Sequence, residues 1–363
     1  MFYQKILRPI LFKTDPEWIH DFTSASLGFI SRQKLFFNPI KNFLFVDDEI
    51  LHTTVGKINF LNPIGLAAGF DKNIGSPLAY PMLGFGFAEL GSITYRAQAG
   101  NPKPRLWRLP DDNSLIVYYG LANCGAKITK EKMEKMPHHF IPYGISIAPT
   151  TGLSVEEMAE DYCKSFSLLH PYGDYITLNV SCPNVTSCET FVQISFIKEL
   201  AQRIKEIRQT EKIDKDIYLK IGSNLSPTGL DKIIEICLEN NITGVVATNL
   251  LKDRAGMVAR SSAQRLDHPG GISGKLLVKN SNEIIKYIRQ STKGKLKIIG
   301  LGGVFTAQDA YEKIKLGADL IQMITGFIYN GPLAVKHINL GLIKLLQKDG
   351  FKNISEAVGK NVS

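Results

Sequence analysis

Short apolar runs alternate with amphipathic stretches from about residue 55 onward. Segments with apolar residues at helical spacing lie between several of these runs. Continuous apolar strands separated by helices are typical of a parallel sheet, and about eight such units predict a closed (β/α)8 TIM barrel of the α/β class. The predicted strands are Ile64–Ala68, Phe87–Ser92, Gly144–Ala148, Tyr175–Ser181, Ile217–Ile221, Gly244–Thr248, Leu296–Gly300 and Leu320–Ile324. The predicted helices include Val155–Leu169, Phe191–Gln209, Leu230–Glu239, Asn282–Ser291 and Ala307–Leu316.

The N-terminal segment has a different pattern and predicts a small two-helix extension. One helix runs from Phe2 to about Lys13, and a second begins at Asp15-Pro16-Glu17, which combines an N-cap aspartate with a proline and an acid in the first turn. A further apolar stretch leads into the main domain. The extension could pack on the core, or it could lie on a membrane surface. We divide the chain into an extension (1–46), a barrel (47–345) and a C-terminal tail (346–363).

Composition narrows the possible partners and the compartment. The formal net charge of +9 fits nucleic acid, anionic lipid or anionic small molecules, but no arginine-rich block or basic-aromatic repeat supports nucleic acid. No apolar run approaches the ~20 residues that span a bilayer, and the N-terminus lacks the features of a secretory signal. The five cysteines form no C-x-x-C pair, which argues against a zinc site or a disulfide framework and favours a reducing compartment.

Polar residues gather after the predicted strands, at the face where barrels of this class carry their chemistry. In Ala67–Asn73, small residues let a flat ring approach the backbone, and Lys72 could neutralise an anionic substrate or be an ordinary surface lysine. In Leu178–Asn184, two asparagines flank Cys182. Their amides suit the edge of a heterocycle, and the thiol could act as a general base or acid, or be a buried small residue.

A lysine and several glycines indicate a phosphorylated ligand. Lys220 ends an apolar strand and is costly to bury unless it faces an anion or a polarised ring. Glycine-rich turns at Gly270–Gly274 and Gly300–Gly303, followed by Ile324–Phe327, offer backbone N–H groups that suit a phosphate. Each turn is weak evidence alone, but their order matches the loops that bind phosphate in many barrels.

Long strings of residues resemble the dihydroorotate dehydrogenases. The resemblance covers about residues 1–336 and includes Asn62–Lys72, Gly84–Gly91 and Gly100–Pro110. Asn101–Pro110, together with Asp15–Phe22, is similar to the quinone-linked class in particular. In that class two N-terminal helices form a hydrophobic tunnel to the flavin and lie on the membrane. The resemblance therefore implies a peripheral protein on the cytoplasmic face of the membrane.

The resemblance also implies an activity and a set of site residues. Dihydroorotate would be oxidised to orotate in pyrimidine biosynthesis, with hydride transfer to FMN and onward transfer of electrons to a membrane quinone. Cys182 stands at the position of the base, and His20 and Arg108 match the quinone pocket. Lys72, Asn179, Asn184 and Asn249 would hold the substrate. Ala68, Gly69, Ser92, Lys220, Thr248, Gly274, Gly303 and Thr325 would hold FMN.

The chain departs from the family pattern near the expected substrate. The quinone-linked class normally has serine where Cys182 stands. Val117 replaces a substrate-binding asparagine, and Leu250 replaces a threonine or serine. Loss of two polar partners would weaken orotate binding by roughly 2–6 kcal/mol unless another group, such as the hydroxyl of Tyr118 or Tyr119, compensates. Leu121, close to Val117, replaces an aromatic residue, and two further changes are Ile324 for a tyrosine and Ser146 for an asparagine.

These departures leave alternatives open. One is a paralogous FMN oxidoreductase that acts on another dihydropyrimidine or cyclic amide. A second is an FMN-binding protein without turnover. The retained polar residues argue against it, and these are Lys72, Asn179, Cys182, Asn184 and Lys220. A metal-dependent barrel hydrolase has little support, because the seven histidines do not sit at the predicted strand ends.

Overall fold

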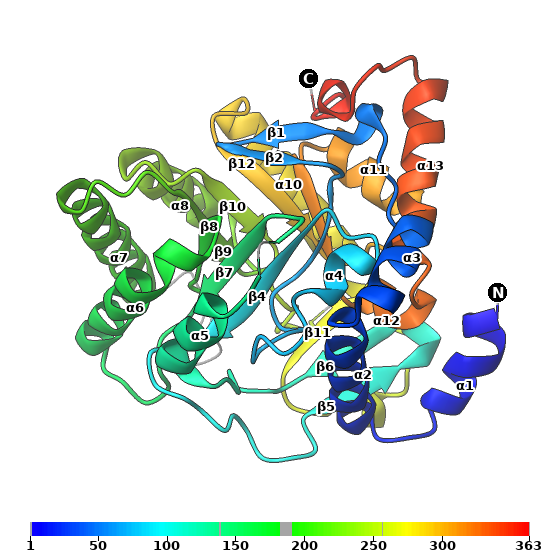
Figure 1. Ribbon diagram of the computed structural model, residues 1–363. Helices are drawn as coiled ribbons and strands as arrows, with labels where there is room; N and C mark the ends of the chain where they lie inside the picture. Colours follow the sequence, from blue (N-terminus) through cyan, green and yellow to red (C-terminus); the bar gives the residue numbers. More distant parts are fainter. Residues whose placement is uncertain (1, 138, 182–190, 256, 363) are drawn as a thin grey trace.

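Eight parallel strands close into a barrel, as the sequence pattern predicts (Figure 1). The computed structural model describes residues 2–137, 139–181, 191–255 and 257–362. Neighbouring strands around the barrel follow the order β10-β12-β13-β3-β4-β7-β8-β9. Their bounds are β3 (Ile64–Leu66), β4 (Phe87–Ile93), β7 (Tyr143–Ile147), β8 (Tyr175–Asn179), β9 (Asp216–Ile221), β10 (Gly244–Ala247), β12 (Lys297–Leu301) and β13 (Leu320–Met323).

Helices surround the barrel, and several begin at capping residues. Ser154 and Glu157 form a capping box at the start of α6, and Thr306 and Asp309 form one at the start of α11. The five helices predicted from the sequence correspond to α6 (Val155–Leu169), α7 (Phe191–Thr210), α8 (Pro227–Glu239), α10 (Val278–Thr292) and α11 (Ala307–Lys315). The others are α4 (Ala79–Met82), α5 (Gly125–Glu134), α9 (Ala263–Leu266), α12 (Thr325–Asn330) and α13 (Ala334–Lys348).

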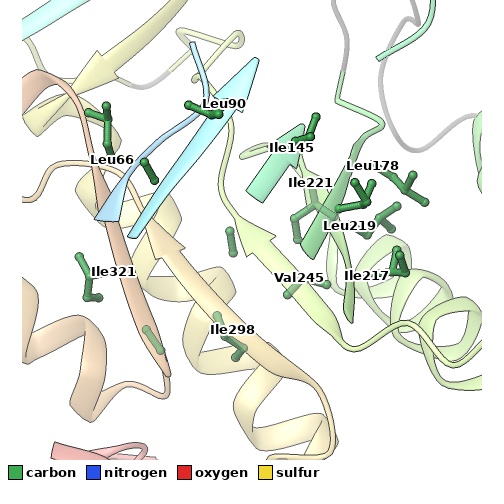
Figure 2. Close-up of a cluster of buried hydrophobic side chains, with 14 of the residues drawn as sticks. Leu66, Leu90, Ile145, Leu178, Ile217, Leu219, Ile221, Val245, Ile298 and Ile321 are labelled. Carbon is green, nitrogen blue, oxygen red and sulfur yellow. The ribbon is translucent and has the colours of Figure 1, made fainter. Parts of the chain in front are cut away.

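The strands are buried on both faces, and β9 shows how the two faces differ. Ile217, Leu219 and Ile221 belong to the large core between the strands and the helices, and all eight barrel strands contribute labelled side chains to the part of it drawn in Figure 2. Tyr218 instead packs inside the barrel in a smaller cluster. Lys220, on the same face as Tyr218, lines a cavity at the mouth. The alternation along one strand thus places a charged group at the open end of the barrel.

Two small antiparallel sheets complete the domain, and neither was predicted from the sequence. The hairpin of β1 (Thr53–Val55) and β2 (Ile58–Phe60) adds Val55 and Phe60 to the inner cluster. The second sheet has three strands, with β6 (Ser114–Val117) between β5 (Leu106–Leu109) and β11 (Gly271–Gly274). Val117 pairs with Gly271 in this sheet, so a departure from the family pattern lies beside the first glycine turn.

The N-terminal extension forms helical segments beside the mouth of the barrel (Figure 1). It contains a π-helical turn (Tyr3–Leu7), α1 (Arg8–Leu11), α2 (Pro16–Ser31) and α3 (Lys34–Leu44). The sequence pattern predicts the first two helical regions, and the structure adds α3. Tyr3 fixes the start of the chain, because its hydroxyl donates to the Ile328 carbonyl oxygen at 2.7 Å. None of the helices in the described residues is long and apolar enough to cross a bilayer.

Candidate active site

One cavity of about 710 Å³ lies between the extension and the mouth of the barrel. It is lined by every predicted site residue that the structure describes. Cys182 and Asn184 lie outside the described residues. The lining residues from the prediction are His20, Ala68, Gly69, Lys72, Ser92, Arg108, Asn179, Lys220, Thr248, Asn249, Gly274, Gly303 and Thr325.

Two of the predicted substrate residues are joined through a serine. Ser181 Oγ donates to Asn179 Oδ1 at 2.9 Å, and Asn249 Nδ2 donates to Ser181 Oγ at 2.6 Å. Asn179 Nδ2 in turn donates to Ser92 Oγ at 2.9 Å. These bonds fix the orientation of both amides relative to the strand ends, which is how a site presents donors and acceptors to one edge of a ring.

The lysine predicted to face the flavin has an acidic partner inside the barrel. Lys220 Nζ lies 4.0 Å from Glu89 Oε1, and the two side chains are 4% and 0% exposed. Glu89 Oε2 accepts hydrogen bonds from Thr177 Oγ1 at 2.9 Å and Gln322 Nε2 at 3.0 Å. Burial lowers the pKa of Lys220, and the Glu89 carboxylate opposes that shift.

The lysine predicted to bind the substrate is packed against an aromatic ring. Lys72 Nζ lies 3.9 Å from the ring centroid of Tyr119, and the Arg105 guanidinium carbon lies 4.9 Å from the same centroid. Burial lowers the pKa of Lys72 to about 8, and the carboxylates of Asp21 and Asp71 oppose this. Lys72 is therefore a cation held in the cavity and not an ordinary surface lysine.

The glycine turns form a narrow cradle that accepts no larger side chains. Gly274 has a φ of +99° and Gly303 has a φ of +71°, a region that L-residues rarely adopt. A Cβ atom on Gly303 would lie 2.1 Å from Val278 Cγ2 and 3.0 Å from the Gly274 carbonyl oxygen. The hydroxyls of Ser273 and Thr325 lie 2.9 Å apart at the same place. Hydroxyl groups and glycine backbone N–H groups together are suitable hydrogen-bond donors for a phosphate ester.

A buried hydroxyl at the barrel mouth also fits a bound cofactor. Thr248 Oγ1 is buried and has no hydrogen-bond partner among the described residues. Unsatisfied buried polar atoms are rare in proteins, and a ligand in the adjoining cavity is one explanation for such an atom. With Lys220 and the glycine cradle, Thr248 makes this cavity suitable for a flavin with a phosphate tail.

His20 and Arg108 lie on the extension side of the cavity. His20, on α2, packs its ring edge against Phe70 with centroids 5.0 Å apart. Burial and the nearby Lys72 lower the pKa of His20 to about 3, so the ring is neutral at physiological pH. Arg108 donates to the carbonyl oxygens of Phe12 at 3.2 Å and Thr14 at 2.6 Å. Arg108 therefore holds the segment between α1 and α2 against the cavity.

The residues that depart from the family pattern lie at the same cavity. Val117, Leu121, Leu250 and Ile324 line it, and they make this part of the wall apolar. Ser146 is buried, and its hydroxyl lies 2.8 Å from that of Ser92. Tyr118 and Tyr119 also line the cavity, but the Tyr119 hydroxyl is buried and has no partner among the described residues.

Sequence reasoning missed three polar residues of the site. Ser181 lies in the run between the two asparagines, and a hydroxyl two residues after Asn179 was a usable signal. Glu89 lies within an apolar run, where a single acid is a sign of a buried ion pair. The sequence suggests a role for the Tyr119 hydroxyl, whereas in the structure the Tyr119 ring contacts Lys72. Within the described ranges, no three His, Cys, Asp or Glu side chains are grouped to hold a metal ion.

Comparison with known proteins identifies the family. The family model for dihydroorotate dehydrogenase matches residues 50–346. The chain belongs to the dihydroorotate dehydrogenase family. It is 38% identical to the dihydroorotate dehydrogenase (quinone) of Nostoc punctiforme, covering 99% of this chain and 98% of that protein. Identity to the protein of the same name from Trichodesmium erythraeum is 40%, with 98% of each chain covered.

Solved structures of the dihydroorotate dehydrogenase family share the fold. The crystal structure of the Eimeria tenella enzyme in complex with ferulenol superimposes with a TM-score of 0.83, at 26% identity over 96% of each chain. The ligand-free enzyme from the same organism also superimposes with a TM-score of 0.83. Both the barrel and the helical extension therefore lie within the region shared with this family.

Proposed function

We propose that this chain oxidises dihydroorotate to orotate, with FMN as its resident cofactor and a membrane quinone as the electron acceptor. The family consists of oxidoreductases that act on a CH–CH bond, and the full-length relatives are quinone-linked enzymes by name. The observation that carries the proposal is that one continuous cavity joins the glycine cradle and Lys220 to the extension residue His20.

The chain's own residues account for substrate binding. Lys72 is the cation that would neutralise the substrate carboxylate, since it is held in the cavity against Tyr119. Asn179 and Asn249, oriented by Ser181, would bind the amide edge of the ring. Cys182 would remove the substrate proton, a role that rests on the resemblance alone. Bound FMN would supply the two-electron acceptor.

The cofactor would be held from two sides. Lys220, supported by Glu89, would bind the polar edge of the flavin ring at the barrel mouth. Thr248 Oγ1 would gain the partner it lacks. Gly274, Gly303 and Thr325 would bind the phosphate at the start of α12. The cavity thus offers a charged group for a polar ring edge and a separate cradle for a phosphate. A flavin mononucleotide would use both, whereas a simple phosphate ester would use only the cradle.

The extension would place the quinone entrance on a membrane surface. Its helices expose apolar side chains, among them Phe29 at 67%, Leu35 at 79% and Phe43 at 62% exposure. An apolar helical surface on a protein of net charge +9 suits the interface of an anionic bilayer. The location on the cytoplasmic face belongs to this proposal.

Anaerobic flavin spectroscopy tests the function. The purified protein should show a flavin spectrum, which dihydroorotate bleaches and a short-chain ubiquinone analogue restores. The Cys182→Ala variant should bind FMN yet bleach at least a hundredfold more slowly, the loss expected for a general base. A dihydropyrimidine without a carboxylate, run in parallel, tests the altered-substrate hypothesis raised by Val117 and Leu250. A colourless protein that takes up no FMN, or a flavin that dihydroorotate does not reduce, contradicts the proposal.

A further inference from the structure

A buried lysine that the proposed reaction does not use lies behind the glycine cradle. Lys313, on α11, is 1% exposed. Its ammonium group donates to Ser281 Oγ at 2.8 Å and to Asn282 Oδ1 at 2.7 Å. Both acceptors belong to the N-terminal part of α10, the helix that follows β11 and its terminal Gly274. Lys313 therefore adds a positive charge close to a helix start that already carries positive partial charge.

A continuous chain of hydrogen bonds leads from Lys313 to the cradle. Ser281 Oγ donates to the Leu301 carbonyl oxygen at 2.7 Å. Leu301 immediately precedes Gly302 and Gly303, and all three residues line the cavity. The packing is close, since a Cβ atom on Gly302 would lie 3.2 Å from Ser281 Cβ. The position of the glycine turn is thus tied to the position of the Lys313 ammonium.

The charge on Lys313 has no carboxylate partner among the described residues. Asp309 is paired with Lys275 at 2.6 Å and accepts the backbone N–H groups of Phe305 and Thr306. Glu312 is exposed and forms no ion pair with Lys313, but it accepts a hydrogen bond from the Asn282 amide at 3.2 Å. Burial lowers the pKa of Lys313 to about 7, and the carboxylates of Glu312 and Asp309 oppose this shift from beyond ion-pair distance. Burying an unpaired ammonium is costly, so an anion nearby would favour its charged form.

We propose that Lys313 is a positioning residue of the phosphate subsite. Its buried charge acts through Ser281 and Leu301, and it makes the cradle selective for the dianionic phosphate ester of the flavin over an uncharged flavin. The proposal rests on the proposed function, since it assumes that FMN occupies the cavity. A neutral residue at position 313 should weaken FMN binding about tenfold, the size expected for one charge acting at a distance through protein.

Binding of FMN and of riboflavin to the FMN-free protein separates the phosphate contribution from the rest. The Lys313→Met variant keeps a side chain of similar length without the charge. It should bind FMN about tenfold more weakly than the wild type and bind riboflavin equally well. Lys315→Met is the matched control, because Lys315 is on the same helix, is partly exposed and pairs with Asp349 at 3.8 Å. The control should leave both dissociation constants unchanged.

A merely structural lysine would behave differently. If Lys313 only supported the fold, its loss would weaken both flavins equally and lower the thermal midpoint of the FMN-free protein. We expect instead that the midpoint does not fall, because an unpaired buried charge has been removed. Ser281→Ala, which keeps the charge and breaks the hydrogen-bond chain, should also weaken FMN selectively, and it provides the test if Lys313→Met does not fold.

The binding measurements on the wild type and the Lys313 variant each either support or contradict the role of Lys313. Selective loss of FMN affinity supports the inference, whereas equal loss for both flavins, or no loss, overturns it alone. A wild-type protein that binds neither flavin overturns the proposed function and this inference together. The two failures are distinguishable. Failure of the proposed function is seen in the wild-type protein, whereas failure of this inference alone is seen only in the variants.

Discussion

The ammonium of Lys220 lies 4.0 Å from the Glu89 carboxylate, and both groups are buried inside the barrel. Thr177 and Gln322 donate to one oxygen of Glu89, while the oxygen nearer to Lys220 accepts no hydrogen bond in the described part of the chain. The pair places one positive and one negative charge beneath the cavity. Its stability depends on both charges being present, because either alone would be an uncompensated charge in a medium of low polarity.

Glu89→Gln should therefore destabilise the protein strongly. The substitution keeps the shape and leaves Lys220 without a counter-charge, so the free energy of unfolding should fall by about 3–5 kcal/mol. Urea denaturation of the FMN-free protein measures this change. In the double variant Glu89→Gln, Lys220→Met, most of the loss should be recovered. A double variant no more stable than Glu89→Gln would show that the ion pair is not the cause.

Orotate binding should weaken as pH rises through about 8, the value to which burial lowers the pKa of Lys72. Above that pH Lys72 loses the charge that would attract the carboxylate, and affinity should fall by up to about tenfold per pH unit. Titration of the flavin spectrum with orotate between pH 6.5 and 9.5 measures the dissociation constant of orotate at each pH. Lys72→Met should bind weakly at every pH, and a pH dependence that survives in this variant would assign the titration elsewhere.

The same shift has a consequence for stability. The pKa of Lys72 is lower in the folded protein than its ordinary 10.5, so the unfolded chain binds more protons between about 8 and 10.5. The free energy of unfolding should therefore rise with pH across that window. Below it Lys72 is protonated in both states, so its contribution to stability should not change with pH. Lys72→Met removes this contribution.

Gly303→Ala should abolish tight FMN binding while the barrel still folds. The backbone at Gly303 has a φ of +71°, and a new methyl group would lie 2.1 Å from Val278 Cγ2. Strain in the left-handed region costs roughly 1–2 kcal/mol, and the cradle must widen to relieve the contact. Gly350→Ala is the control, because Gly350 has a φ of +80° and nothing within 4 Å of its new methyl group. Equal FMN affinity in the two variants would contradict the steric argument.

Glu17→Gln should loosen the extension without unfolding the barrel. Glu17, on α2, is 5% exposed and accepts from Arg105 Nη2 at 2.8 Å and Lys103 Nζ at 3.2 Å. Burial tends to raise the pKa of Glu17, but the hydrogen bonds from Arg105 and Lys103 outweigh it and lower the pKa. The contact should persist at neutral pH and weaken as pH falls below the ordinary range of a glutamate.

Hydrogen exchange measures this local change. Protection of residues 16–31 should decrease by about 2 kcal/mol in Glu17→Gln, somewhat less than for a fully buried pair. Protection in the barrel strands should not change. Glu199→Gln is the control, since its pair with Arg203, at 2.7 Å, is 42% and 39% exposed and should contribute little. A uniform loss of protection over the whole chain would contradict a local role.

Charged residues on the exposed face of the extension should prevent membrane binding. Phe29→Glu and Leu35→Glu replace side chains that are 67% and 79% exposed, so the fold should tolerate them. Co-sedimentation with vesicles of phosphatidylcholine and phosphatidylglycerol measures binding. Leu238→Glu, at a 43% exposed position on α8, is the control and should bind like the wild type. Undiminished binding of both extension variants would contradict attachment through this surface.

The sequence by itself determined the barrel and most of the cavity wall. Strands buried on both faces must be apolar along their length, and helices that cover them must be amphipathic, so eight strand units were visible without any structure. Asn179 and Lys220 lie at the ends of β8 and β9, and Lys72 lies in the loop that follows β3. Because parallel strands of a barrel end at one face, the order along the chain was sufficient to group them.

Only the tertiary structure decided which distant residues contact each other. The pairing of β6 with β11 brings Val117 beside Gly271, and no local pattern specifies that pairing. Glu89 is hidden in an apolar run, and its meeting with Lys220 depends on the closure of the barrel. The sequence around Lys313 is typical of the surface of an amphipathic helix, yet Lys313 is buried and donates to Ser281 on α10. Periodicity and caps are encoded over a few residues, whereas the environment of a charge is set by segments far away in the chain.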